Sequence, residues 1–254
     1  MLISWRYKFV FVHIPKTGGT AFTAALAPFA RLRDRFAYDI ARKPIIRRAV
    51  TTALGPVYEQ RITGIAPHSG VRVFERKFGA SVLDDMTVLT IVRNPFTRFI
   101  SYFRHINRIP NHKMREAVQG MTFQQALPVL LQRGANVQTR LLEGVDGATP
   151  KGVIVAHTER LSADIADWHE RLGLPRPLSV KRVNVSDPDA EAAASASDNE
   201  RTSERTSGSA DVKWLCNAYG DAVDDFVKAN RAEFDAFGYS CDIADAFDPP
   251  ESAP

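Results

Sequence analysis

The sequence predicts an α/β fold in which a central parallel sheet is flanked by helices. Two runs of six largely apolar residues, 9–14 and 87–92, are typical of strands buried on both faces of a parallel sheet. Each run is followed at once by a helix-forming segment, and this alternation recurs further along the chain. With 254 residues, 44% of them hydrophobic, the chain can bury one large core. We therefore expect a single domain over residues 1–254.

The first run leads into a turn that carries a lysine, two glycines and two threonines, in the order Pro15-Lys16-Thr17-Gly18-Gly19-Thr20. Residues 21–26 favour a helix, so the turn lies where the carboxyl end of a strand meets the amino end of a helix. Backbone N–H groups are unpaired there, and the helix dipole favours an anion. The glycines let a phosphate-sized group approach the backbone, Lys16 adds a positive charge, and the threonines add hydroxyl donors. The segment predicts either a P-loop-like oxyanion site or a simple strand-to-helix link.

The run 87–92 is followed by Arg93-Asn94-Pro95. Asn94 is a favoured helix N-cap and Pro95 a favoured first helical residue, so we expect a helix over 96–106. Its apolar residues recur at helical spacing, and its polar residues share another face: Arg98, Ser101, Tyr102 and His105. A strand-end arginine, followed by an arginine and a serine on a helix, predicts a second anion site. The alternative for this segment alone is an amphipathic helix with solvated polar residues.

Together the two segments resemble the donor-binding motifs of the sulfotransferases. The turn at 15–20 looks like their 5′-phosphosulfate loop, and residues 93–102 look like their 3′-phosphate motif, R-x-P-x-x-R-x-x-S-x-Y. The motifs occur in this order and about 75 residues apart. Three further segments, 136–141, 158–161 and 183–186, are more weakly similar to segments of the carbohydrate-type branch. This branch includes heparan and dermatan sulfate 2-O-sulfotransferases and bacterial relatives.

The resemblance implies 3′-phosphoadenosine 5′-phosphosulfate (PAPS) as the sulfuryl donor. It implies that Lys16 neutralises the charge that develops on the oxygen between phosphorus and sulfur, and that Arg93 and Ser101 grip the 3′-phosphate. It also implies that the whole loop holds the 5′ end: Lys16, Thr17, Gly18, Gly19 and Thr20. In-line transfer of this kind depends on positioning and charge stabilisation. Because the sequence has no His, Cys and Asp cluster at metal-ligand spacing, we expect no metal.

A general base must take the proton of the acceptor hydroxyl. The resemblance implies a histidine or glutamate just beyond the second strand, which we expect over 61–65. His68 follows that strand and is our first choice, because loops at this edge of open α/β sheets carry the chemistry. A surface loop histidine is the alternative. We expect His13 to be a core or supporting group and His105 a partner of the nucleotide helix, with Glu59 as a more distant candidate.

We therefore expect a sulfotransferase that moves a sulfuryl group to the hydroxyl of a glycan, glycolipid or small molecule. One alternative is a P-loop phosphotransferase. Its loop would place a glycine well ahead of a Gly-Lys pair, whereas Lys16 precedes both glycines here. It would also need a strand that ends in an acidic metal ligand, and the run 87–92 ends in Arg93. The other alternative is a protein that binds the nucleotide without catalysis.

The net charge of +4 is unevenly distributed. Residues 1–100 carry 16 Lys and Arg against 6 Asp and Glu, a net of +10, and the rest of the chain has a net of −6. A basic half suits an anionic donor. No nucleic-acid motif or interleaved aromatic residue accompanies it, so we expect no nucleic-acid partner. The basic segment 31–48 is either a solvated helix face or a rim that binds an acidic sugar or lipid headgroup.

The rest of the chain continues the alternation of helices and strands. Patterns predict helices over 122–131, 160–172 and 211–237, a strand over 152–157 and an extended segment over 180–185. Trp214 and Phe226 are among the expected core residues of the last helix. The segment 186–210 is rich in Ser, Ala, Asp, Glu and Thr, which predicts disorder, either as a surface insertion or as a lid over the nucleotide. Residues 242–254 are expected to form a loose tail.

The sequence also carries weaker signals of location. Cys216 and Cys241 show no framework spacing, so a reducing compartment is the default. There is no apolar run of membrane-spanning length, and the first predicted strand begins within about eight residues of Met1, so we expect neither a signal peptide nor a membrane anchor. Because eukaryotic Golgi relatives carry such an anchor, we expect a soluble, cytoplasmic, bacterial enzyme. Oligomeric state is not indicated.

Overall fold

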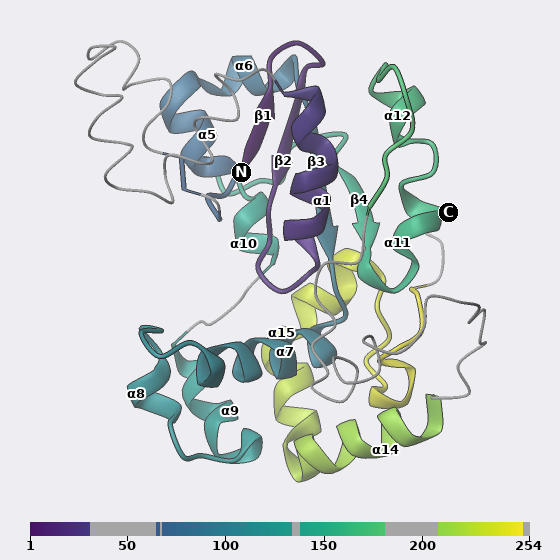
Figure 1. Ribbon diagram of the computed structural model, residues 1–254. Coiled ribbons are helices and arrows are strands. Elements are labelled where there is room, and N and C mark those ends of the chain that lie inside the picture. The colour runs from purple at the N-terminus through teal and green to yellow at the C-terminus, as the bar shows by residue number, and fades with distance from the viewer. Residues whose placement is uncertain (31–64, 67, 134–137, 181–207, 251–254) are drawn as a thin grey trace.

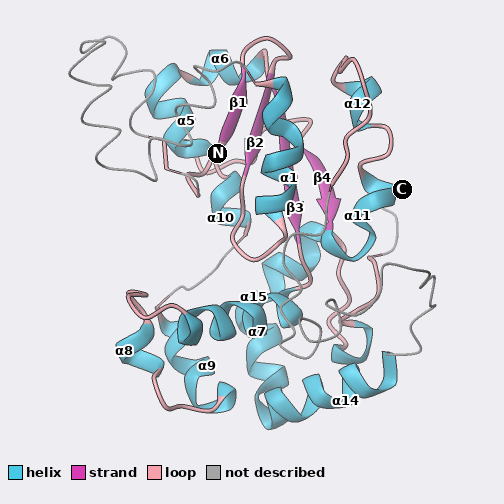
Figure 2. Cartoon of the chain, in the orientation of Figure 1, coloured by secondary structure: helices cyan, strands magenta, loops and turns pink. Residues whose placement is uncertain are grey.

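The computed structural model describes residues 1–30, 65–66, 68–133, 138–180 and 208–250, and within them it has the predicted α/β architecture (Figures 1 and 2). Four strands form one sheet in the order β1-β2-β3-β4. Strand β1 (Leu2–Ser4) pairs antiparallel with β2 (Phe9–Val12), whereas β2, β3 (Thr87–Val92) and β4 (Ile154–His157) are parallel. The sequence prediction did not include β1, which is only three residues long.

The alternation of side chains along β2 and β3 divides the core into two layers. Val10 and Val12 belong to a layer with Phe96 from helix α7 (Pro95–Arg108) and Phe226 from helix α15 (Val223–Phe237), whereas Phe11 packs in a second layer. That second layer contains Phe22 and Leu26 from helix α1 (Gly19–Leu26). It also contains the later residues Ile165, Trp168 and Leu172. Both faces of the parallel sheet are therefore buried, which explains why its strands are uniformly apolar.

The helices are short except where they cover the sheet or build the helical part below it (Figure 1). The longer ones are α1 (Gly19–Leu26), α5 (Val71–Phe78), α7 (Pro95–Arg108), α9 (Phe123–Gln132), α14 (Gly208–Tyr219) and α15 (Val223–Phe237). The shorter ones are α6 (Ala80–Asp84), α8 (Arg115–Val118), α10 (Thr139–Leu142), α11 (Leu161–Asp164) and α12 (Trp168–Arg171). Single 3₁₀ turns occur at Ala27–Phe29, Thr158–Arg160, Gly220–Ala222 and Ile243–Asp245.

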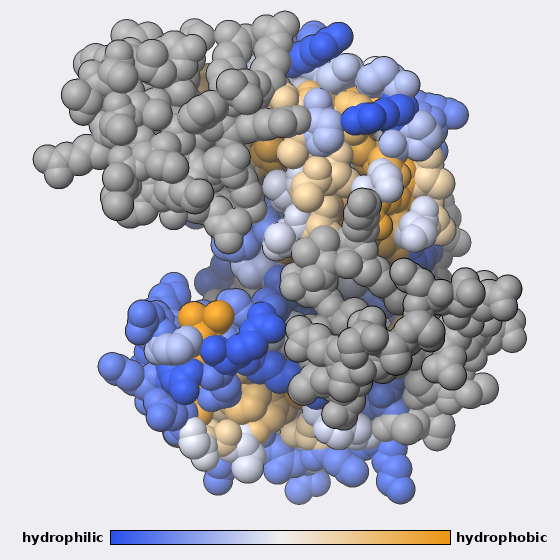
Figure 3. All heavy atoms as spheres, in the orientation of Figure 1, coloured by the Kyte–Doolittle hydropathy of each residue, from blue (hydrophilic) through white to orange (hydrophobic). Residues whose placement is uncertain are grey.

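The carboxyl ends of the three parallel strands lie at one edge of the sheet, facing the helical part. Strand β2 leads there into the loop before α1, β3 leads into α7, and β4 leads into the turn at Thr158–Arg160. Loops at this edge are the usual place for a ligand in an open α/β sheet. In the space-filling view, hydrophilic residues gather over α7 and α8, in the helical part below this edge (Figure 3).

Several predicted elements differ from the observed ones. The expected helix over 160–172 is two short helices, α11 and α12, and the expected helix over 211–237 is divided into α14 and α15 by the 3₁₀ turn at Gly220–Ala222. The segment from Asp242, expected to be a loose tail, is folded back as far as residue 250. Ala246 is fully buried, and the carbonyl of Pro250 accepts a hydrogen bond from Arg160 at 3.0 Å.

Some expectations concern residues outside the described part of the chain. These are the strand over 61–65, the basic segment 31–48, Glu59, and the segment 186–210 apart from residues 208–210, which begin α14. Within the described residues, no helix combines the length and the apolar character needed to cross a bilayer. The same residues contain no group of three or more His, Cys, Asp or Glu side chains placed to hold a metal ion.

Candidate active site

The loop between β2 and α1 is bent by two residues in the left-handed region. Gly18, the residue before the helix, has φ 77°, and Lys16 has φ 71°, a conformation that costs free energy in a residue with a side chain. The hydroxyl of Thr17 donates to the carbonyl of Ile14 at 2.9 Å, and Thr17 is fully buried. The Thr17 side chain therefore braces the loop from inside, while Thr20 is exposed in the first turn of α1.

Gly19 is required by the close approach of the strand that precedes the loop. A Cβ atom at this position would overlap the ring of His13, which is buried directly after β2. The His13 ring also stacks on Phe11, with centroids 6.0 Å apart and planes inclined by 22°. Its packing confirms that His13 is a core group, and the glycine lets the loop lie against it.

Arg93 is fixed at the second strand end by bonds to both its backbone and its side chain. Its N–H donates to Oε1 of Gln138 at 3.0 Å, and its carbonyl accepts from Nε2 of the same amide at 3.0 Å. Its Nε donates to Oγ1 of Thr97 at 3.0 Å. Asn94 caps α7 as predicted, because its Oδ1 accepts from the N–H of Phe96 at 3.0 Å.

A half-buried carboxylate, Glu159, acts on the charge of this arginine. Glu159 accepts from the N–H of Asn94 at 2.9 Å and from the hydroxyl of Tyr239 at 2.8 Å. Burial lowers the pKa of Arg93, and the charge of Glu159 opposes that shift. The strand end is therefore held in one conformation, with a carboxylate that keeps the guanidinium charged.

One hydroxyl joins the two strand ends. Oγ1 of Thr158, in the turn after β4, lies 3.1 Å from the carbonyl oxygen of Thr17 and 2.8 Å from that of Val92. The first carbonyl belongs to the loop that carries Lys16 and the second to the residue before Arg93. Thr158 therefore fixes the position of the loop relative to Arg93.

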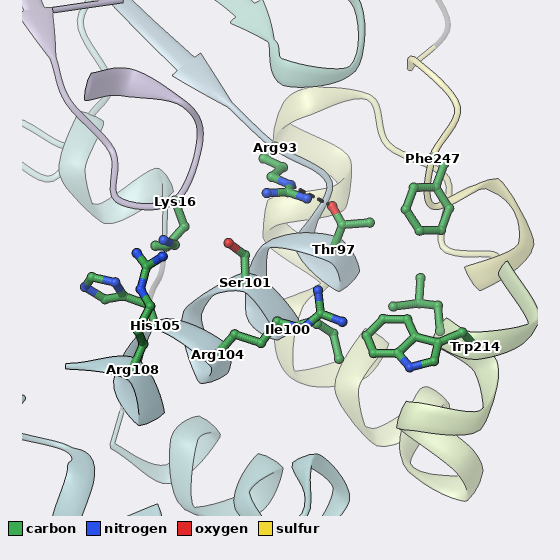
Figure 4. A pocket seen from close by; sticks show the side chains of 11 residues that line it. Lys16, Arg93, Thr97, Ile100, Ser101, Arg104, His105, Arg108, Trp214 and Phe247 are labelled. Atoms are coloured by element: carbon green, nitrogen blue, oxygen red, sulfur yellow. Dashed lines mark hydrogen bonds between the residues drawn. The ribbon is translucent and has the colours of Figure 1, made fainter. Parts of the chain in front are cut away.

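Lys16 and Arg93 open into one cavity of about 170 Å³ (Figure 4). Lys16, His105 and Arg108 gather on one side of it, Trp214 and Phe247 stand on the other, and Arg93, Thr97 and Ser101 lie between them (Figure 4). Ile100, Arg104 and Leu215 complete the lining. Four of the lining residues are cations and none is acidic, so the cavity is built for a ligand with negative groups at separate points.

A model of the sulfotransferase family matches residues 1–240, which is nearly the whole chain. The chain belongs to the sulfotransferase family. No curated protein and no solved structure gives a significant match to it. The predicted family is therefore confirmed, and the chain is a transferase of sulfuryl groups.

The clustered cations of the cavity shift the pKa values of two side chains of this sulfotransferase. Burial lowers the pKa of Lys16, and the charges of Arg108 and Arg93 lower it further. Burial also lowers the pKa of His105 to about 4, with smaller contributions from Lys16, His112, Arg108 and His68. A bound anion would relieve both effects, because it would supply the negative charge that the lining residues lack.

His68 lies beside the loop rather than among the lining residues of the cavity. Its Nδ1 is 3.0 Å from the carbonyl oxygen of His13, and the two rings meet edge to face with centroids 4.6 Å apart. Because a carbonyl oxygen only accepts, Nδ1 carries the proton in this contact. The His68 side chain is exposed.

Arg98 departs from its expected position. It is 1% exposed and does not line the cavity, whereas Ser101 and His105 of the same helix do. Burial lowers the pKa of Arg98 to about 10, and the charge of Glu233, which is also buried, opposes the shift. Arg98 therefore serves the packing of α7 against α15 instead of the anion site.

The lining residues that the sequence prediction did not place at the site include Arg104, Arg108, Trp214 and Phe247. The two arginines could have been found, because they continue the helix face of Thr97, Ser101 and His105 at spacings of three and four. Trp214 was expected in the core, but it is 44% exposed and its ring carries the Arg104 guanidinium 4.5 Å from its centroid. Nothing local in the sequence places Phe247 at the cavity.

Proposed function

We propose that this sulfotransferase moves a sulfuryl group from PAPS to a hydroxyl acceptor by in-line displacement. The observation that carries the proposal is the cavity that joins the Lys16 loop to Arg93, with cations at both points and no acid in its lining. PAPS has the matching pattern, with a phosphosulfate at one end and a separate phosphate on the ribose. An ordinary nucleotide lacks the ribose phosphate and would leave Arg93 without a ligand.

The residues of the loop and of α7 would bind different ends of the donor. Lys16, with the loop amides of Thr17 to Thr20, would hold the 5′ end, and Lys16 would neutralise the oxygen that leaves as the bond to sulfur breaks. Arg93 and Ser101 would hold the 3′-phosphate. Trp214 and Phe247 offer aromatic faces on the side of the cavity away from Lys16, where a nucleobase can stack (Figure 4).

His68 is our candidate for the general base. It is exposed beside the loop that carries Lys16, and its Nδ1 contacts the carbonyl of His13, which is itself packed against the loop through Gly19. The acceptor would approach on this side of Lys16, opposite the leaving oxygen. The expected acceptor is a glycan or glycolipid, a proposal that rests on the resemblance to the carbohydrate-type branch.

The binding test uses 3′,5′-adenosine bisphosphate (PAP), the product nucleotide, in a calorimetric titration without metal. AMP and ATP serve as matched controls, because they share the adenosine and lack the 3′-phosphate. Binding of PAP that is at least tenfold tighter than that of AMP supports the proposal. Tighter binding of ATP that requires magnesium would favour a phosphotransferase instead, and binding of none of them would contradict the donor assignment.

Transfer itself is tested by incubating the protein with sulfur-labelled PAPS and a panel of glycan acceptors. Labelled product should form with the unaltered protein, and less of it should form with His68→Gln. Glutamine keeps a polar side chain but cannot act as a base near neutral pH. PAP affinity should stay unchanged in that variant. A protein that binds PAP and transfers to no acceptor would be a nucleotide-binding protein without catalysis.

A further inference from the structure

His105 occupies a distinctive place in the cavity. It projects from α7 on the same side as Lys16 and Arg108, away from Trp214 (Figure 4). Its ring meets that of His112 edge to face, with centroids 5.7 Å apart. Its Nδ1 is buried and has no hydrogen-bond partner within the described part of the chain. A buried polar atom usually has a partner, so this nitrogen lacks one that a rearranged or protonated ring could gain beside a bound anion.

The basic groups that lower the pKa of His105 come from four segments of the chain. Lys16 belongs to the loop after β2, Arg108 to α7 itself, His112 to the turn before α8, and His68 to the segment before α5. Burial and these groups together keep the His105 ring neutral in the ligand-free protein near neutral pH, with a pKa of about 4. No carboxylate contributes to its electrostatic surroundings among the described residues.

The bound donor would change this balance. Its 5′ end brings negative charge to the Lys16 side of the cavity, which offsets the cations that disfavour a charged ring. A protonated imidazole would then have two N–H donors, one more than the neutral ring. The leaving phosphate oxygen is already a good leaving group, because phosphate ionises with a pKa of about 6. It therefore needs charge stabilisation and not a proton.

We propose that His105 takes up a proton from solvent when the donor binds and that the resulting imidazolium holds the 5′ end of the donor beside Lys16. This inference rests on the proposed function, because PAPS supplies the negative charge. The proton comes from the buffer and stays on the ring, so no bond of the donor is broken in this step. His105 is thus assigned as a donor-binding residue that the resemblance did not include.

The test measures protons taken up on binding. PAP is titrated into the protein at pH 6.5 in two buffers of different ionisation enthalpy, and the difference in observed heat gives the number of protons exchanged. The unaltered protein should take up about half a proton more than His105→Asn, because a histidine restored to its ordinary pKa of about 6.5 is half protonated there. PAP phosphates lose protons equally in both proteins, so the comparison isolates His105.

Two controls keep the result specific. His169→Asn, a substitution on α12 far along the chain from the site, should behave like the unaltered protein. The imidazole resonances of His105, assigned by their loss in His105→Asn, should titrate at a higher pH with PAP than without it. PAP binding with equal proton uptake in the His105 variant, or an unshifted His105 titration, would overturn this inference alone. Absence of PAP binding would overturn both this inference and the proposed function.

Discussion

Replacing Lys16 by methionine should change activity and stability in opposite directions. Methionine keeps most of the length of the side chain and meets the same left-handed backbone, at φ 71°, so the substitution removes the charge and little else. Turnover should fall, because the charge on the leaving oxygen loses its partner. The ligand-free protein should become more stable, because the folded state disfavours a charged lysine beside Arg108 and Arg93.

The size of the loss of turnover follows from the surroundings of Lys16. Two unit charges 4 Å apart interact by about 1 kcal/mol in bulk water and about 4 kcal/mol near a protein surface. Lys16 is half-buried in a cavity, so a loss of about 3 kcal/mol is expected, or roughly 10²-fold in turnover. For stability the sign is fixed by the pKa, which is lower in the folded than in the unfolded state. Protonated Lys16 therefore costs free energy at neutral pH, and methionine removes that cost.

Three measurements test this prediction, with Lys228→Met as the control on an exposed face of α15. Single-turnover transfer should slow by roughly 10²-fold in Lys16→Met, while PAP affinity in calorimetry falls by a smaller factor and the melting temperature rises. The control should change none of the three. Wild-type turnover in Lys16→Met would remove Lys16 from the chemistry. A lower melting temperature would refute the electrostatic account of the loop.

Three further substitutions test the other walls of the cavity. Arg93→Ala should erase the preference for PAP over AMP in calorimetry, whereas Arg93→Lys should keep part of it; a preserved preference in both would place the 3′ site elsewhere. Trp214→Ala should weaken PAP binding by about 1 to 3 kcal/mol, the usual value of base stacking, with little change in melting temperature. Trp5→Ala, exposed to a similar extent, is its control, and equal PAP affinity in both variants would contradict base stacking at Trp214. Thr158→Val should lose about 1 kcal/mol of stability and bind PAP more weakly, because the loop is no longer tied to β3, and Thr158→Ser should restore both. A valine variant that melts and binds like the unaltered protein would show that this hydroxyl does not position the loop.

The parts of the site that local sequence determines were predictable. The apolar run over β2, the glycines after it, and the Asn94-Pro95 start of α7 each specify their conformation through neighbours in the chain. These features also carry the motifs of the family, and the family match confirms the membership that they predicted. The three parallel strands of the sheet and the approximate start of α7 therefore followed from the sequence, whereas β1 did not.

The remaining parts depend on tertiary packing that a linear pattern does not contain. Trp214 and Leu215 are neighbours on one helix and both line the cavity, yet Leu215 is 1% exposed and Trp214 is 44% exposed, because only one face of α14 meets the core. Arg98 matches the family motif in sequence, but the turn of α7 directs it toward Glu233. Phe247 reaches the cavity only because the chain after α15 folds back, which no local signal indicated.

The wall of the cavity that contains Phe247 is synthesised after the other walls. Lys16 leaves the ribosome well before the aromatic wall opposite it, which Phe247 completes only after more than two hundred further residues. Since domains fold as their chain becomes available, the loop and α7 would form while the wall across from them is still incomplete. A nascent chain at that stage would hold an open basic groove, and the donor would find its full set of contacts only once Phe247 is in place. Nucleotide binding would thus report that the segment of Phe247 has docked.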